Sequence, residues 1–209
     1  SALCEKTEAD VDEVARAIGA DSRIGSKFLK ASIGFGGSCF QKDILNLVYL
    51  CLYYGLNEVA EYWHQVLKIN DYQKNRFAQT IIQYFGGDLT GKKILILGWA
   101  FKANTNDSRE SASIFVTQKL FEAGAIIDIY DPKVSKINII KDINLIWGYT
   151  IDQVSDRLSI KETNLLFDKY DAYVILTEYE DFKFLEIDPN LVFDGRNIFN
   201  QALYSIGKG

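Results

Sequence analysis

The decapeptide at residues 34–43, GFGGSCFQKD, places a cysteine directly after a glycine-rich loop and at the expected start of a helix. Glycine lets a backbone approach a ligand closely and adopt positive φ angles. The free N–H groups of a helix N-terminus stabilise a thiolate, the nucleophilic form of cysteine. Lys42 adds positive charge, and Asp43, one helical turn after Cys39, is placed to hold a water molecule or act as a base. The pattern predicts covalent catalysis by Cys39.

The other two cysteines have a simpler interpretation. Cys4 and Cys51 fall in apolar helical stripes, where a thiol is usually a small buried side chain. The same interpretation competes for Cys39, but the flanking Gly-Gly-Ser and the helix start favour a nucleophile there. The chain has no CxxC pair and one histidine, so we expect neither a disulfide framework nor a metal site.

Apolar residues at spacings of three and four predict helices on both sides of the glycine loop. A helical pattern within residues 1–30 stops at Gly19, a second helix is expected over 39–54, and a long third helix over 57–85. The residues expected on the buried side of the second helix are Ile44, Leu47, Val48 and Cys51, and those marking the apolar stripe of the third are Val59, Trp63, Val66 and Phe77.

After residue 88 the pattern changes from helical spacing to short, continuous apolar runs. These runs predict buried strands at 93–97, 125–130, 172–177 and 191–193, with an amphipathic helix at 111–122. Strand, helix and strand at this spacing indicate a parallel, Rossmann-like sheet. Residues 135–170 give no readable pattern. We therefore predict an α/β fold with two domains: a central helical domain with the cysteine loop at 1–88, and a Rossmann-like domain at 89–209.

Composition and charge limit the classes of partner. The net charge of −5 argues against a nucleic-acid backbone, which needs a basic face, although local Lys and Arg side chains can still bind a small anion. No apolar run approaches the roughly 20 residues of a membrane helix, and we expect no signal peptide. We expect a cytoplasmic protein with no nucleic-acid or membrane partner.

The glycine loop resembles the signature of the UDP-glucose/GDP-mannose dehydrogenase family. Further segments are similar to other motifs of that family and occur in the same order: 23–25 (RIG), 28–32 (FLKAS), 98–102 (GWAFK), 105–111 (TNDSRES) and 193–196 (FDGR). The resemblance covers the chain except for about residues 135–170. The family's dinucleotide-binding GxGxxG domain is absent from these residues, so we expect the chain to be inactive alone.

The resemblance implies a two-step oxidation of a nucleotide sugar at C6, with two NAD molecules as hydride acceptors. By resemblance, Cys39 captures the aldehyde and lies beside the cofactor, Asp43 assists the hydrolytic water, and Lys42 and Arg109 contact NAD. Arg23 is implied to reach the substrate of a neighbouring subunit. The implied contacts to the UDP-sugar are Arg23, Phe28, Leu29, Lys30, Ser32, Gly34, Phe35, Gly36, Gly37, Phe101, Lys102 and Arg196.

The sequence indicates the type of reaction more firmly than it indicates which nucleotide sugar is the substrate. Gln41 in FQKD favours UDP-glucose over GDP-mannose, whose enzymes tend to have Pro at this position. A dehydrogenase of GDP-mannose or of a UDP-N-acetylhexosamine stays open, as does a non-catalytic module that binds a nucleotide sugar and dimerises. The apolar stripe of helix 57–85 predicts at least a homodimer. Asp131, followed by Pro132, is interpreted as a turn residue rather than a ribose ligand.

Overall fold

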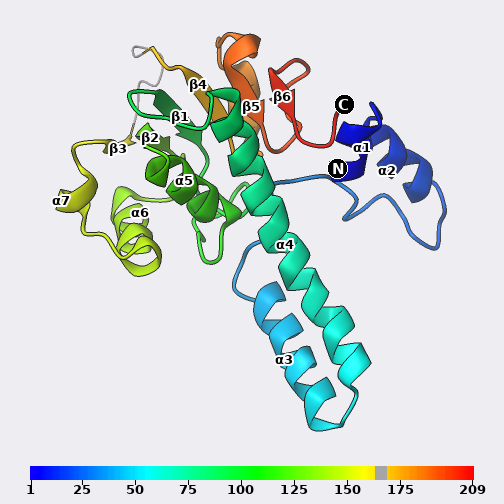
Figure 1. The fold of residues 1–209 in the computed structure, drawn as a ribbon. Helices are drawn as coiled ribbons and strands as arrows, with labels where there is room; N and C mark the ends of the chain where they lie inside the picture. Colours follow the sequence, from blue (N-terminus) through cyan, green and yellow to red (C-terminus); the bar gives the residue numbers. More distant parts are fainter. Residues whose placement is uncertain (163–168) are drawn as a thin grey trace.

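In the computed structural model, a hairpin of two helices projects from a layered α/β body (Figure 1). The structure describes residues 1–162 and 169–209. The hairpin consists of α3 (Phe40–Tyr53) and α4 (Asn57–Tyr84), which are joined through Gly55 at a φ of 75°. Beyond the hairpin, α4 continues onto α5 (Ala112–Glu122) and the sheet. One uninterrupted helix therefore belongs both to the projection and to the body.

Within the part of the chain that the structure describes, six parallel strands form the sheet in the order β3-β2-β1-β4-β5-β6. The strands are β1 (Lys93–Leu97), β2 (Ile126–Tyr130), β3 (Leu158–Lys161), β4 (Ala172–Ile175), β5 (Val192–Asp194) and β6 (Tyr204–Ser205). The direction of the strand order reverses between β1 and β4. At such a switch point the loops after the strands diverge and leave a crevice at the carboxyl ends of the strands.

The two faces of the sheet are covered differently. Ile94 and Ile96 of β1 join a core with α4 and α5, which also holds Trp99 and Trp147. On the opposite face, Leu95 and Leu97 pack with Phe182 of the short 3-10 helix η2 (Glu180–Phe184) and with neighbouring loop residues. Because both faces are covered, β1 is apolar at nearly every position.

The remaining helices are short and lie at the edges of the body. The helices α1 (Ala2–Lys6) and α2 (Val11–Gly19) lie beside the C-terminus (Figure 1), where the Val11 N–H donates to the carbonyl of Gly207. Between β2 and β3 the chain forms α6 (Lys136–Asp142), a π-helical turn η1 (Ile143–Trp147) and α7 (Ile151–Val154), and η3 (Pro189–Leu191) precedes β5.

The predicted α/β class and parallel sheet are confirmed, with corrections to individual elements. The last predicted strand lies one residue later, at β5, and the N-terminal helical pattern is split into α1 and α2. Of the residues expected on buried faces, Ile44, Cys51 and Phe77 are buried, Leu47 and Val48 are half-buried, and Val59 is exposed. The division into 1–88 and 89–209 stays a prediction. No helix within the described residues has the length and hydropathy to cross a membrane.

Candidate functional site

The glycine loop is packed directly against the segment that precedes α5. Gly37 donates its N–H to the carbonyl of Arg109 over 2.9 Å. A Cβ atom on Gly36 would lie 2.4 Å from the backbone oxygen of Glu110, and one on Gly37 would lie 3.1 Å from the ring of Phe101. The loop therefore needs glycine because two backbone segments, far apart in the sequence, touch here.

Cys39 is the N-cap residue of α3, and its side chain is exposed, whereas Cys4 and Cys51 are buried. Its carbonyl accepts the N–H of Asp43, whose side chain is exposed in the first turn of α3. The thiol lies 3.8 Å from the hydroxyl of Ser38. The helix start and the exposure of Cys39 match the arrangement expected of a nucleophile at a helix N-terminus.

A groove of about 340 Å³ runs beside the cysteine loop. Its lining residues are Ser38, Gln41, Lys42, Leu45, Arg109 and Glu110. The side chain of Arg109 donates to the carboxylate of Asp107 at 2.9 and 2.8 Å. These hydrogen bonds and the negative charge of Asp107 raise the pKa of Arg109, and the nearby Cys39 side chain adds to the shift. The structure thus brings Lys42 and Arg109, which the sequence implicated in cofactor binding, into one groove beside Cys39.

A second cavity, of about 620 Å³, lies beyond the ends of β4 and β5. It combines Lys30 and Ser32, before the glycine loop, with Arg196, after β5. Lys183 adds a third cation, while Glu178 adds negative charge. The other lining residues are Asp12, Ala31, Glu180, Asn197, Ile198 and Asn200.

Arg196 is held from two directions. Its guanidinium forms an ion pair with Glu178 and donates to the carbonyl of Phe101 over 3.4 Å. Its own backbone N–H donates to the carboxylate of Asp194, which also accepts the N–H groups of Ile198 and Phe199. Burial raises the pKa of Asp194, although those backbone donors oppose the shift. Within the described residues the Nε of Arg196 is buried and has no hydrogen-bond partner.

Phe101 connects the two halves of the site. Its ring faces Gly37, and its carbonyl accepts from Arg196. The exposed Lys102 places its Nζ 5.3 Å from the centroid of that ring. The backbone just before Phe101 is fixed by Asp131, whose carboxylate accepts the N–H groups of Trp99 and Ala100 at 2.6 and 2.9 Å.

The interpretation of Asp131 as a turn residue agrees with its contacts. Its second carboxylate oxygen accepts the N–H groups of Lys133 and Val134, both at 2.8 Å, and the hydroxyl of Tyr179 at 3.0 Å. The whole carboxylate is therefore used within the protein, and burial together with Asp131 raises the pKa of Tyr179.

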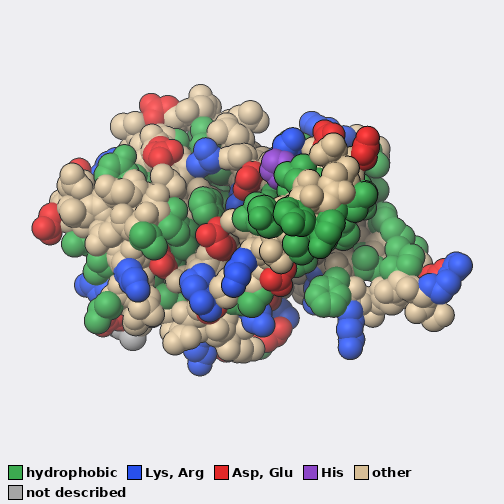
Figure 2. Space-filling view, turned by 90° about the horizontal axis from the view of Figure 1, so that it is seen from below, with side chains coloured by type: hydrophobic (Ala, Val, Ile, Leu, Met, Phe, Trp, Pro, Cys, Tyr) green, Lys and Arg blue, Asp and Glu red, His purple; other side chains and the backbone are tan. Residues whose placement is uncertain are grey.

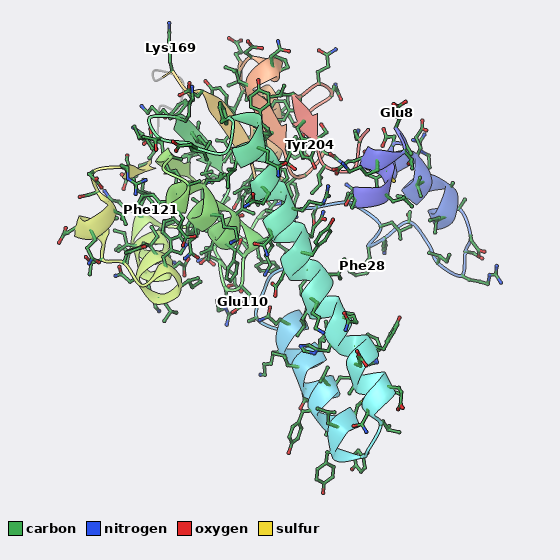
Figure 3. All side chains as sticks on the ribbon, in the orientation of Figure 1. Glu8, Phe28, Glu110, Phe121, Lys169 and Tyr204 are labelled. Carbon is green, nitrogen blue, oxygen red and sulfur yellow. The ribbon has the colours of Figure 1, made fainter. Side chains whose placement is uncertain are left out.

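Most of the residues implicated in substrate binding line neither cavity, and Arg23, Phe28 and Leu29 lie on a separate segment. Arg23 is exposed and pairs with Asp21 at 2.6 Å, and Phe28 is fully exposed at a φ of 66°. Leu29 is half-buried and lies near Gly19. In the view of Figure 3, Phe28 and Glu110 lie on opposite sides of α4, so this segment is separated from the cysteine groove. Like the other site assignments, those of Arg23, Phe28 and Leu29 remain predictions.

Sequence reasoning missed several residues that shape the site. Glu178 and Lys183 line the larger cavity, Asp194 fixes the loop of Arg196, and Asn70 binds the glycine loop from α4. Glu178 follows the predicted strand 172–177 directly, and a polar residue at the carboxyl end of a parallel strand was a usable signal. Within the described residues, no cluster of three or more His, Cys, Asp or Glu side chains could hold a metal ion.

Comparison with known proteins gives consistent matches. A model of the UDP-glucose/GDP-mannose dehydrogenase family, central domain, matches residues 1–72, and one of that family's UDP binding domain matches residues 95–201. The chain is 47% identical over 234 residues to UDP-glucose 6-dehydrogenase 4 of Arabidopsis thaliana, covering 100% of this chain and 49% of the relative. It is 52% identical over 209 residues to UDP-glucose 6-dehydrogenase of Gallus gallus, covering 96% and 42%.

Among solved structures, a UDP-glucose dehydrogenase from Pyrobaculum islandicum aligns with a TM-score of 0.78 at 29% identity. That alignment covers 99% of this chain and 45% of the other. The chain therefore spans about half the length of the relatives it matches.

Proposed function

The chain belongs to the UDP-glucose/GDP-mannose dehydrogenase family, and we propose that it supplies the nucleophile and the nucleotide-sugar cavity of an NAD-dependent UDP-glucose 6-dehydrogenase. The observation that carries this proposal is the placement of the exposed Cys39 at the start of α3, beside a groove lined by Lys42 and Arg109. The glycine loop joins that groove to the cavity of Arg196 through Phe101.

The larger cavity suits the diphosphate of a nucleotide sugar. Lys30 and Arg196 supply cationic donors to this cavity. A planar guanidinium binds phosphate oxygens well because its donors form a fixed fork. By likeness to the family, Phe101 and Lys102 bind the uridine and a phosphate, and the backbone of 34–37 faces the sugar.

The cysteine groove fits one end of an anionic dinucleotide. Two exposed cations, Lys42 and Arg109, lie next to the apolar side chain of Leu45. NAD, when bound, accepts one hydride in each of the two oxidations. The rest of the NAD-binding site belongs to a dinucleotide domain that we expect upstream of Ser1. We therefore propose that this chain alone does not catalyse the oxidation of the sugar.

Cys39 performs the covalent step. Its thiolate sulfur adds to the C6 aldehyde and forms a C–S bond, which makes the carbon tetrahedral and able to release a hydride. Loss of that hydride leaves a thioester. Water, activated by Asp43, then cleaves the C–S bond, which gives the uronate and returns the free thiol.

The hairpin surface is proposed to form the contact between two subunits. Figure 2 looks at the hairpin from its tip and shows hydrophobic side chains gathered there. The exposed apolar residues on α3, α4 and the turn include Tyr49, Leu52, Tyr53, Leu56, Val59 and Tyr62. Apolar patches of this kind on one element usually mark an interface.

The function is tested by product analysis with the full-length protein. With UDP-glucose and NAD, we expect two NADH and one UDP-glucuronate for each sugar consumed. GDP-mannose and UDP-N-acetylglucosamine serve as comparison substrates, and a higher kcat/KM with either would reassign the substrate. Tight UDP-glucose binding without any NADH would instead support a non-catalytic binding module and end the enzyme proposal.

A further inference from the structure

Asn70, in the middle of α4, binds the glycine loop with both ends of its side-chain amide. Its Oδ1 accepts the backbone N–H of Phe35 over 2.8 Å, and its Nδ2 donates to the carbonyl of the same residue over 3.1 Å. The side chain is buried, with 5% of its surface exposed. An amide that meets both polar groups of one residue fixes that residue in position and orientation.

Two neighbours on the same face of α4 extend this contact. The side-chain amide of Gln73 donates to the carbonyl of Ser32 over 2.7 Å. The aliphatic part of Lys74 lies 3.2 Å from where a Cβ on Gly34 would stand. Positions 70, 73 and 74 are spaced i, i+3 and i+4, so they share one side of the helix. Residues 32–35 are therefore laid along α4.

The loop backbone at position 34 lies so close to Asn70 that a side chain would not fit between them. Gly34 has a φ of +133°, and a Cβ there would lie 2.7 Å from the Oδ1 of Asn70. After Phe35, only residues 36–38 precede Cys39, and two of these are already held by Glu110, Arg109 and Phe101. The position of the thiol is thus set on one side by the two hydrogen bonds between Asn70 and Phe35, which form a clamp on the loop, and on the other side by the start of α3.

We propose that Asn70 is a positioning residue for the covalent step, because it holds the glycine loop in the conformation that presents the Cys39 thiol to the sugar. The inference rests on the proposed function. Asn70 touches neither of the two cavities, so its effect passes through the backbone of Phe35. Replacing it changes where the thiol lies and leaves the diphosphate-binding cations in place.

The test compares Asn70→Ala with Asn75→Ala, which removes an exposed asparagine from the same helix. In the full-length protein, Asn70→Ala should lower kcat for uronate formation by about a hundred-fold, the cost of displacing a reacting group by about 1 Å. The Kd for UDP should stay within about two-fold, and hydrogen exchange of the amides at 34–38 should accelerate at least ten-fold. Asn75→Ala should match the wild type in all three measurements.

Asn70→Asp serves as a second variant in case Asn70→Ala does not fold. It keeps the shape and the acceptor for the Phe35 N–H but loses the donor to the Phe35 carbonyl, so a smaller loss of kcat in the same direction is expected. A wild-type kcat in either folded variant, or equal losses of kcat and UDP affinity, would overturn the inference. A wild-type protein inactive with UDP-glucose and NAD would overturn the proposed function instead, while the exchange measurement would still report on the clamp.

Discussion

Replacing Gly36 with alanine should separate the glycine loop from the segment that precedes α5. Gly36 has no positive φ, so the substitution introduces crowding without backbone strain. Its new Cβ would lie 2.4 Å from the Glu110 oxygen and 2.9 Å from the Cα of Ser111, both backbone atoms that cannot rotate away. Ordinary contact begins near 3.4 Å, so the two segments must move apart by about 1 Å.

That displacement sets the expected magnitudes. Overpacking of this kind costs about 1–3 kcal/mol of stability. A shift of about 1 Å at the thiol should lower kcat about a hundred-fold. The hydrogen bond from Gly37 to Arg109 should also be lost, which uncouples Arg109 from the cysteine groove.

The assay pairs thermal unfolding with NADH formation by the full-length protein. Gly148→Ala is the matched control, because Gly148 has a φ of +75° and a new Cβ there would meet no described atom within 4 Å. It should cost about 1–2 kcal/mol through backbone strain and leave kcat unchanged. If Gly36→Ala keeps wild-type kcat, the contact between the loop and Glu110 does not position the thiol and the reasoning is wrong.

Three further predictions concern the charges and the thiol. Cys39→Ser should nearly abolish uronate formation, and product chromatography should show aldehyde that is trapped or released. In the wild type, iodoacetamide should label Cys39 well before the two buried cysteines. Uronate formation by Cys39→Ser at the wild-type level would remove Cys39 from the mechanism. Glu178→Gln should tighten UDP binding about two- to five-fold by calorimetry, because phosphates no longer compete for Arg196; weaker binding would mean that the ion pair orients Arg196 instead. The Arg109 guanidinium lowers the pKa of the Asp107 carboxyl. The pair therefore stabilises the fold at pH values above the ordinary pKa of an aspartate, and this stabilisation is lost as the pH falls through the lowered pKa of Asp107. In Arg109→Ala, an NMR titration should show that the pKa of Asp107 rises toward its usual range.

The parts of the fold that could be predicted were those with strong local patterns. The run KILIL at β1 is apolar because both faces are covered, and its bounds are predicted correctly. The strands β3 and β6 were missed because they are short and lie at the two edges of the sheet, where half-exposed residues break the apolar pattern. In α6 and η1, exposed apolar side chains such as Ile137 and Leu145 obscure the helical period.

The candidate site divides in the same way. The glycines and Cys39 form a contiguous segment, so their chemistry could be recognised from types and spacing alone. Asn70 lies 35 residues after Phe35, and an isolated amide in a helix carries no periodic or chemical signal. Its role follows only from the packing of α4 against the loop, which is a property of the folded chain.

The continuity of α4 has a mechanical consequence. Its 28 residues contain neither glycine nor proline, so the helix is a rod of about 42 Å without a built-in hinge. Asn70 forms hydrogen bonds with the glycine loop, and seven residues later Phe77 is fully buried in the core beside the sheet. These two points stay about 10 Å apart along the axis whatever the rest of the protein does. The helix therefore keeps a constant distance between the sheet and the loop that carries the thiol. A displacement of its exposed end at the hairpin tip would move both together.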